Sequence, residues 1–252
     1  MPQDASIELL TAEIRRILHN CEEARVRLRL LGSAAFQLRC PRYATVAQQG
    51  RQFRDLDFAG TRKEAAEIRE VLVSLGYVED REVFVLSEGR RAIFDHGNGL
   101  HIDVFYDVLD FCHPIRLNGR IDADPPTLPL AELLLTKLQI VQINEKDLLD
   151  AIVLLLEHDL GETDAGVINA ARIAKLCADD WGLWRTASMN IGKVSALAGA
   201  ISSISEADRR RVSEQSTRLM ETIKSHPKPL AWRLRAQIGD RVKWYKDVEE
   251  VR

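Results

Sequence analysis

Three aspartates at strand-like positions are the residues of this sequence best suited to chemistry. Asp55 and Asp57 stand two apart in Arg-Asp-Leu-Asp-Phe, and Asp103 stands between apolar neighbours in His-Ile-Asp-Val-Phe. Side chains alternate along a strand, so Asp55 and Asp57 should project from one face while Leu56 faces a core. If the two strands are neighbours, three carboxylates converge on one spot.

Such a cluster of like charges is costly unless a cation joins it, because neighbouring carboxylates disfavour one another's ionised form. Ligand sets made only of oxygen favour Mg²⁺ or Mn²⁺ over zinc. A magnesium ion held by two or three carboxylates takes its remaining ligands from water and substrate phosphates. The three aspartates therefore predict a Mg²⁺ (or Mn²⁺) site beside a phosphate-bearing substrate.

A Gly-Ser turn supplies the second half of the predicted site. Gly32 and Ser33 follow the alternating run Val26–Leu31 and precede the helix-favouring run Ala34–Leu38. Glycine permits close approach of a ligand to the backbone, and N–H groups at the start of a helix can hold terminal phosphates. Gly32 and the hydroxyl of Ser33 are therefore expected to bind phosphate.

The elements that position these residues follow from periodicity. Helical spacing predicts helices over about 6–23 and 61–75, the second opening with a Thr61/Glu64 capping box. Alternation and short turns predict strands at 26–31, 54–58, 82–86, 91–94 and 100–105, the last three as a meander, and residues 41–52 form a loop.

The second half of the chain has a different pattern. Helices are expected at Leu130–Ile143 and Lys146–Glu157, followed by three or four more up to about Val248. The prediction is therefore an α/β core with a small mixed sheet over residues 1–127 and a helical domain over residues 128–252. The basic and aromatic run Trp232–Lys246 is better interpreted as an amphipathic helix with buried aromatics than as an RNA-binding surface.

Three motifs carry a resemblance to a known family. In order, LLGSAAF, RDLDF and HIDVF resemble the DNA polymerase beta-like nucleotidyltransferase superfamily. The segment LPLAELLLTKLQIVQINEKDLLDAIVLLL is similar to the bacterial abortive-infection (AbiEii-like) group, with Lys137, Lys146 and Asp147 at the positions of its lysine and Lys-Asp pair. The resemblance spans roughly Val26 to Glu157, and the Ser33-to-Asp55 interval is longer than the family's usual spacing.

The resemblance implies an α/β (α+β) nucleotidyltransferase fold followed by a C-terminal helical bundle. The enzyme would transfer a nucleoside monophosphate from a nucleoside triphosphate (NTP) to an acceptor hydroxyl. Asp55 and Asp57 would hold Mg²⁺, and Asp103 would complete a second metal site or act as general base. Ser33 and Lys137 would hold the triphosphate.

The acceptor stays open among RNA (tRNA), protein and small molecules. One version is the toxin of a toxin–antitoxin pair, which implies an antitoxin protein as partner. A second is an antibiotic-modifying nucleotidyltransferase. The alternative from another class is a non-catalytic NTP-binding or interaction protein on the same fold.

Net charge, cysteine content and the lack of long apolar runs further narrow the class of protein. The 252 residues carry a net charge of −3, so no global positive field attracts nucleic acid. Four cysteines without a CxxC pair argue against a zinc ribbon and a disulfide framework. The N-terminus lacks a signal-peptide pattern and no apolar run has the length of a membrane span. A cytoplasmic protein without membrane contact is expected.

Overall fold

The computed structural model describes residues 3–47 and 55–248 of the chain. The chain divides into two compact units. The sheet unit consists of Met1–Leu38, Gly50–Leu109 and Arg116–Leu128. The helical unit consists of Arg39–Gln49, Asp110–Ile115 and Pro129–Arg252. Each is described by itself below.

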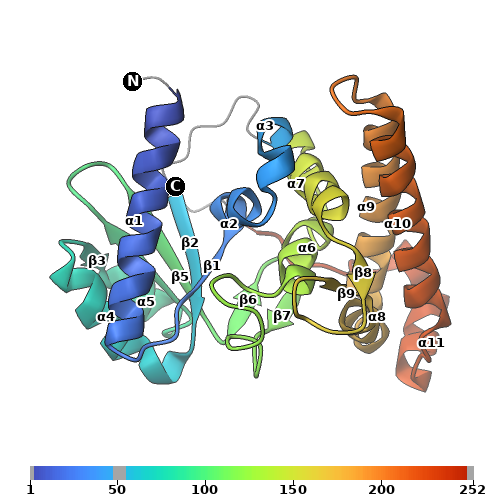
Figure 1. Cartoon of the computed structure of the whole chain (residues 1–252). Coiled ribbons are helices and arrows are strands. Elements are labelled where there is room, and N and C mark those ends of the chain that lie inside the picture. Colours follow the sequence, from blue (N-terminus) through green and yellow to red (C-terminus); the bar gives the residue numbers. More distant parts are fainter. Residues whose placement is uncertain (1–2, 48–54, 249–252) are drawn as a thin grey trace. The chain divides into compact units, whose positions relative to one another are not determined.

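The sheet unit is built on a five-stranded mixed sheet in the order β1-β2-β5-β4-β3 (Figure 1). Strands β2 and β5 run parallel, and the other neighbouring pairs are antiparallel. The bounds are β1 Arg29–Leu31, β2 Asp55–Gly60, β3 Val78–Asp80, β4 Arg91–Asp95 and β5 His101–Tyr106. The strand at Glu82–Leu86 that the sequence predicted is absent from this sheet.

One face of the sheet forms the core of the unit. Its side chains alternate with those of the other face and are fully or almost fully buried: Leu56, Phe58, Phe94, Ile102, Val104 and Tyr106. Helix α4 (Ala65–Ser74) brings Ile68 against Gly60 at the end of β2, and α1 (Gln3–Glu23) packs beside α4. The opposite face carries Asp55, Asp57, His101 and Asp103, so the alternation predicted for β2 and β5 is confirmed at these positions.

Residues 81–86 form helix α5 (Arg81–Leu86), so the strand predicted at 82–86 is wrong. The Asp80 carboxylate accepts hydrogen bonds from the backbone N–H groups of Glu82 (3.0 Å) and Val83 (3.3 Å). That N-cap satisfies donors which a helix start leaves open, and it outweighs the strand preference of the two valines. Strand β3 precedes the helix instead and pairs with β4.

The capping box predicted at Thr61 is also absent. Thr61 precedes a short 3-10 helix, η2 (Arg62–Glu64), and its side chain makes no capping hydrogen bond. The Thr61 hydroxyl instead donates to the Glu64 carboxylate at 2.6 Å. Glu64 also accepts from Arg27 Nε at 2.9 Å, so a long-range ion pair holds the residue that the box would have used.

Helices dominate the helical unit, and four of them follow α7 in the described chain, within the predicted three or four. Two short strands, β8 (Leu160–Gly161) and β9 (Ile168–Asn169), pair in parallel and were not predicted. The helix bounds are α3 Ala44–Ala47, α6 Leu130–Leu138, α7 Glu145–Glu157, α8 Ala170–Asp179, α9 Trp181–Ala200, α10 Glu206–Ser225 and α11 Leu230–Ile238, with 3-10 helices η1 Pro41–Tyr43 and η3 Gly239–Arg241. The chain crosses between the units through β6 (Val108–Asp110) and β7 (Pro114–Arg116).

Helix α6 ends five residues earlier than the predicted Ile143. The amide of Asn190 donates to the carbonyl oxygens of Leu138 (2.9 Å) and Ile140 (2.7 Å), which lie at and just beyond the helix end. The next helix starts at a separate cap, where the Asn144 side chain accepts from the backbone N–H of Asp147 at 3.0 Å. Two side-chain caps therefore set a boundary that apolar periodicity alone does not reveal.

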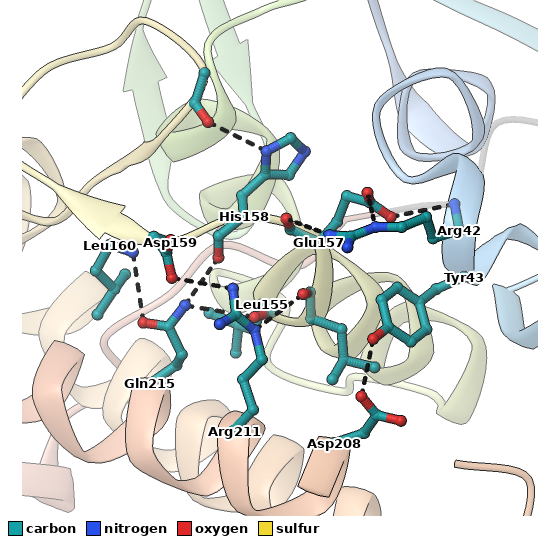
Figure 2. A network of polar contacts seen from close by, with 12 residues as sticks. Arg42, Tyr43, Leu155, Glu157, His158, Asp159, Leu160, Asp208, Arg211 and Gln215 are labelled. Atoms are coloured by element: carbon teal, nitrogen blue, oxygen red, sulfur yellow. Dashed lines mark hydrogen bonds and ion pairs between the residues drawn. The ribbon is translucent and has the colours of Figure 1, made fainter. Parts of the chain in front are cut away.

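The predicted loop at 41–52 is helical in its described part, since η1 and α3 occupy 41–47. The remainder, together with Arg54 of the predicted strand 54–58, lies outside the described residues. Figure 2 shows what holds η1: Arg42 pairs with Glu157 (2.7 Å), and the Tyr43 hydroxyl donates to Asp208 (2.8 Å). Arg211 of α10 donates to the carbonyl oxygen of Leu156 at 3.0 Å. The contacts of Arg42 and Arg211 thus engage groups at the C-terminal end of α7.

The aromatic residues near the C-terminus pack within the helical unit. The indole N–H of Trp232 donates to the Cys177 carbonyl oxygen (2.9 Å), and that of Trp244 donates to the Thr186 hydroxyl (3.1 Å). The Arg235 guanidinium stacks 4.2 Å from the centroid of the Trp181 ring. The half-buried rings and their donors are thus used in packing, but only Leu230–Ile238 forms an α-helix, so the amphipathic helix interpreted over Trp232–Lys246 is wrong beyond Ile238.

The four cysteines form no disulfide, as predicted. Among the residues that the structure describes, no helix combines the length and apolar character needed to cross a bilayer.

Candidate functional site

The polar face of the sheet brings together the aspartates singled out from the sequence. Strands β2 and β5 are parallel neighbours, with Asp57 opposite Asp103 and Asp55 opposite His101. Asp55 is exposed, whereas Asp57 and Asp103 are half-buried. All three side chains belong to the positions that alternate with the buried ones. We call this surface, defined by Asp55, Asp57 and Asp103, the carboxylate face.

The start of α2 (Gly32–Arg39) lies directly against this face. Gly32 has a positive φ of 67°, and a β-carbon built on it would come 1.9 Å from Asp57 Oδ2. The contact arises because β1 pairs with β2 so that Leu31, the residue before Gly32, stands opposite Asp57. Ser33 follows Gly32 in the first turn of α2. The Gly-Ser turn and the Asp-x-Asp pair are therefore neighbours in space.

The third carboxylate has an arginine as its partner. Arg91 of β4 donates from Nε to both oxygens of Asp103 (2.9 Å each) and from Nη2 to Oδ2 (2.5 Å). Its guanidinium also lies 5.5 Å from the centroid of the Phe105 ring. The pair is largely shielded from water, since the Asp103 side chain is 17% exposed.

Burial dominates the electrostatics of this pair. It raises the pKa of Asp103 above its ordinary value, although the hydrogen bonds from Arg91 act in the opposite direction. The pKa of Arg91 is raised, chiefly by its hydrogen bonds to Asp103.

A second pair lies beside Asp55. His101, which stands opposite Asp55 in the sheet, forms a short hydrogen bond through Nδ1 with the Asp95 carboxylate. Both side chains are more than half exposed. The bond fixes the orientation of the imidazole at the edge of the carboxylate face.

The chemistry of the carboxylate face fits a divalent cation of the Mg²⁺ type, which prefers carboxylate oxygens. Within residues 3–47 and 55–248, however, no three His, Cys, Asp or Glu side chains are arranged to hold a metal ion. Both oxygens of Asp103 are engaged by Arg91. Asp55 and Asp57 would provide the first ligands, and Asp103 could join them through both of its oxygens only by leaving Arg91.

Lys137, the predicted phosphate-binding lysine, lies in the helical unit between two aspartates of α7. Its Nζ is 2.7 Å from Asp147 Oδ1 and 3.0 Å from Asp150 Oδ2, and Asp150 is fully buried. Burial by itself would lower the pKa of Lys137, but Asp150 and Asp147 together raise it. The resemblance implied contact of this lysine with a triphosphate, and the structure shows it in an ion-paired cluster with Asp147 and Asp150. Contact of Lys137 with a triphosphate stays a prediction.

Two residues of these clusters were missed from the sequence. Arg91 could have been found, because alternation along 91–94 and antiparallel pairing with β5 place Arg91 and Asp103 on the same face. Asp150 could also have been found, because it follows Asp147 by three residues and therefore shares its face of α7.

No family model matches the sequence, and no curated protein matches it. Among solved structures, the antibiotic-resistance factor ANT(2″)-Ia aligns over 60% of this chain and 83% of its own. The alignment has 11% sequence identity and a TM-score of 0.38, a likeness that assigns neither fold nor function.

Proposed function

We propose that this protein is a metal-dependent nucleotidyltransferase, which transfers a nucleoside monophosphate from an NTP to an acceptor hydroxyl and releases pyrophosphate. The observation that carries the proposal is the position of Asp57. Its carboxylate stands opposite Asp103 in the sheet and touches Gly32 at the start of α2. Carboxylates for a cation and a helix start suited to phosphate thus share one location.

The residues of the proposed site would have the following roles in binding and catalysis. The missing side chain of Gly32 makes room for the Asp57 carboxylate, and the Ser33 hydroxyl and the N–H groups of α2 donate hydrogen bonds to the triphosphate. Asp55 and Asp57 hold Mg²⁺ or Mn²⁺. When bound, the ion neutralises phosphate charge and orients the leaving pyrophosphate. Asp103 serves as a further ligand or as general base for the acceptor hydroxyl.

The structure also favours a second candidate, an NTP-binding protein without transferase activity. Arg91 holds both oxygens of Asp103, which hinders this carboxylate from acting as a base or from binding a cation through both oxygens. Release of pyrophosphate separates the two candidates, because a binding protein leaves the NTP intact.

Incubation with each α-labelled NTP, Mg²⁺ and either total RNA or a cell lysate tests the proposal. Label is expected in RNA, in a protein or in a small molecule, and its destination identifies the acceptor. A labelled protein, or a partner protein that inhibits the activity, would support the toxin–antitoxin version. A labelled small molecule would support the antibiotic-modifying version. Asp57→Asn should abolish the labelling. Labelling of equal extent in this variant would contradict the proposal.

A further inference from the structure

We propose that Arg91 is an internal counter-ion of the carboxylate face and competes with the divalent cation for Asp103. The inference rests on the proposed function, because it concerns the same metal site. It assigns to Arg91 a role that is neither metal ligation nor contact with a reacting atom.

The position of Arg91 is fixed from two sides. Its guanidinium makes a forked set of contacts to Asp103, and the Phe105 ring flanks it. Arg91 stands opposite Phe105 in the antiparallel β4–β5 pair, so its side chain crosses diagonally to Asp103 on the same face. A planar guanidinium in this geometry occupies the directions from which a cation would bind both carboxylate oxygens.

The guanidinium also interacts with the rest of the carboxylate face. The charge of Asp57 contributes to the raised pKa of Arg91, and the charge of Asp55 contributes to the raised pKa of Asp103.

The two possible roles of Arg91 lead to opposite changes in metal affinity when Arg91 is removed. If Arg91 competes with the cation, its removal leaves Asp103 without a partner in a poorly hydrated site, and metal binding becomes tighter. If Arg91 only supports the strand and orients Asp103 as a ligand, its removal disorders the site and metal binding becomes weaker. The sign of the change in metal affinity therefore decides between them.

The test is a titration of the full chain with Mn²⁺ alone, in which free Mn²⁺ is measured by electron paramagnetic resonance. Arg91→Gln should bind Mn²⁺ about tenfold more tightly than wild type, the worth of one charge-assisted hydrogen bond. The Mn²⁺ affinity of Arg91→Lys should lie between those of wild type and Arg91→Gln, because lysine keeps the positive charge but cannot make the forked hydrogen bonds of a guanidinium. Arg90→Gln is the matched control and should leave the affinity unchanged, since Arg90 donates to the Ser87 carbonyl oxygen and pairs with Glu88.

A melting experiment provides a second readout. Without metal, Arg91→Gln should have a lower Tm than wild type. Saturating Mn²⁺ should raise the Tm of Arg91→Gln more than that of wild type, because the ion replaces the lost positive charge. Unchanged or weaker Mn²⁺ affinity in both Arg91 variants would overturn the inference while leaving the metal site in place. Failure of wild type and all variants to bind Mn²⁺ would instead overturn the metal site itself, and the proposed function with it. If Arg91→Gln does not fold, Arg91→Lys decides the sign of the effect.

Discussion

The carboxylate of Asp57 lies against the backbone of Gly32, so closely that a β-carbon at position 32 would come within 1.9 Å of Oδ2. This contact joins the start of α2 to the carboxylate face. It depends on antiparallel pairing of β1 with β2, which sets Leu31 opposite Asp57. A residue with a side chain at position 32 would have to displace the carboxylate on which the proposed site is centred.

Gly32→Ala should therefore destabilise the fold and also remove nucleotide binding. The positive φ alone costs about 1–2 kcal/mol for a residue with a β-carbon. Gly99→Ala is the matched control: Gly99 also has a positive φ (83°), but a β-carbon there would meet nothing within 4 Å. Urea denaturation and nucleotide titration in the presence of Mg²⁺ are the measurements. If both variants bind nucleotide as wild type does, the contact between Gly32 and Asp57 has no part in binding.

Lys137→Ala should lower the stability of the protein strongly. Removal of the lysine takes away an ion-pair partner of the fully buried Asp150, and breaking a buried ion pair costs about 3–5 kcal/mol. Lys175→Ala is the control, because Lys175 pairs with Asp179 at an exposed site and such pairs contribute little. Chemical denaturation measures both. Equal stability of the two variants would show that water replaces the Lys137 ammonium without cost.

The stability of the helical unit should fall in mild acid because of His113. This imidazole is almost completely buried, with Nε2 2.9 Å from the Thr186 hydroxyl. Burial lowers its pKa below the ordinary 6.5, and the carboxylate of Asp180 only partly opposes this. The unfolded chain therefore takes up a proton at a higher pH than the folded protein. The contribution of neutral His113 to the free energy of unfolding is therefore complete above pH 6.5. It decreases as the pH falls from 6.5 through the pKa of His113 in the folded protein.

The measurement is the free energy of unfolding at a series of pH values between 7.5 and 5, in wild type and in His113→Gln. Glutamine keeps a polar group near Thr186 but does not titrate, so the variant should show a flatter dependence over this range. Parallel curves for the two proteins would assign the acid sensitivity to other groups.

Part of the carboxylate face could be predicted from local pattern. Alternation along β2 and β5 places Asp55, Asp57 and Asp103 opposite the buried side, because strand periodicity requires no knowledge of the tertiary fold. The contact between Gly32 and Asp57 could not be derived in this way. It depends on which strands pair and in which register, and those are tertiary properties.

Where the sequence failed, a polar side chain decided the structure. Asp80 caps α5 where two valines favoured a strand, and Asn190 binds the carbonyl groups at the end of α6 from another helix. The partners of Asp103 and Lys137 were missed for a related reason. A charge in a half-buried position takes the nearest opposite charge, and strand pairing and helical spacing bring Arg91 and Asp150 within its reach.

The most direct test of the proposed metal–nucleotide site is a calorimetric titration of each NTP, with and without Mg²⁺, into wild type and Asp57→Asn. Wild type should bind one or more NTPs with an affinity that depends on Mg²⁺, and Asp57→Asn should lose that dependence while it keeps its melting temperature. Asp122→Asn is the control, because Asp122 belongs to the same unit but pairs with Arg27. This variant should bind NTP with the same Mg²⁺ dependence as wild type. Mg²⁺-dependent binding of equal affinity in wild type and Asp57→Asn would contradict the role assigned to the carboxylate face.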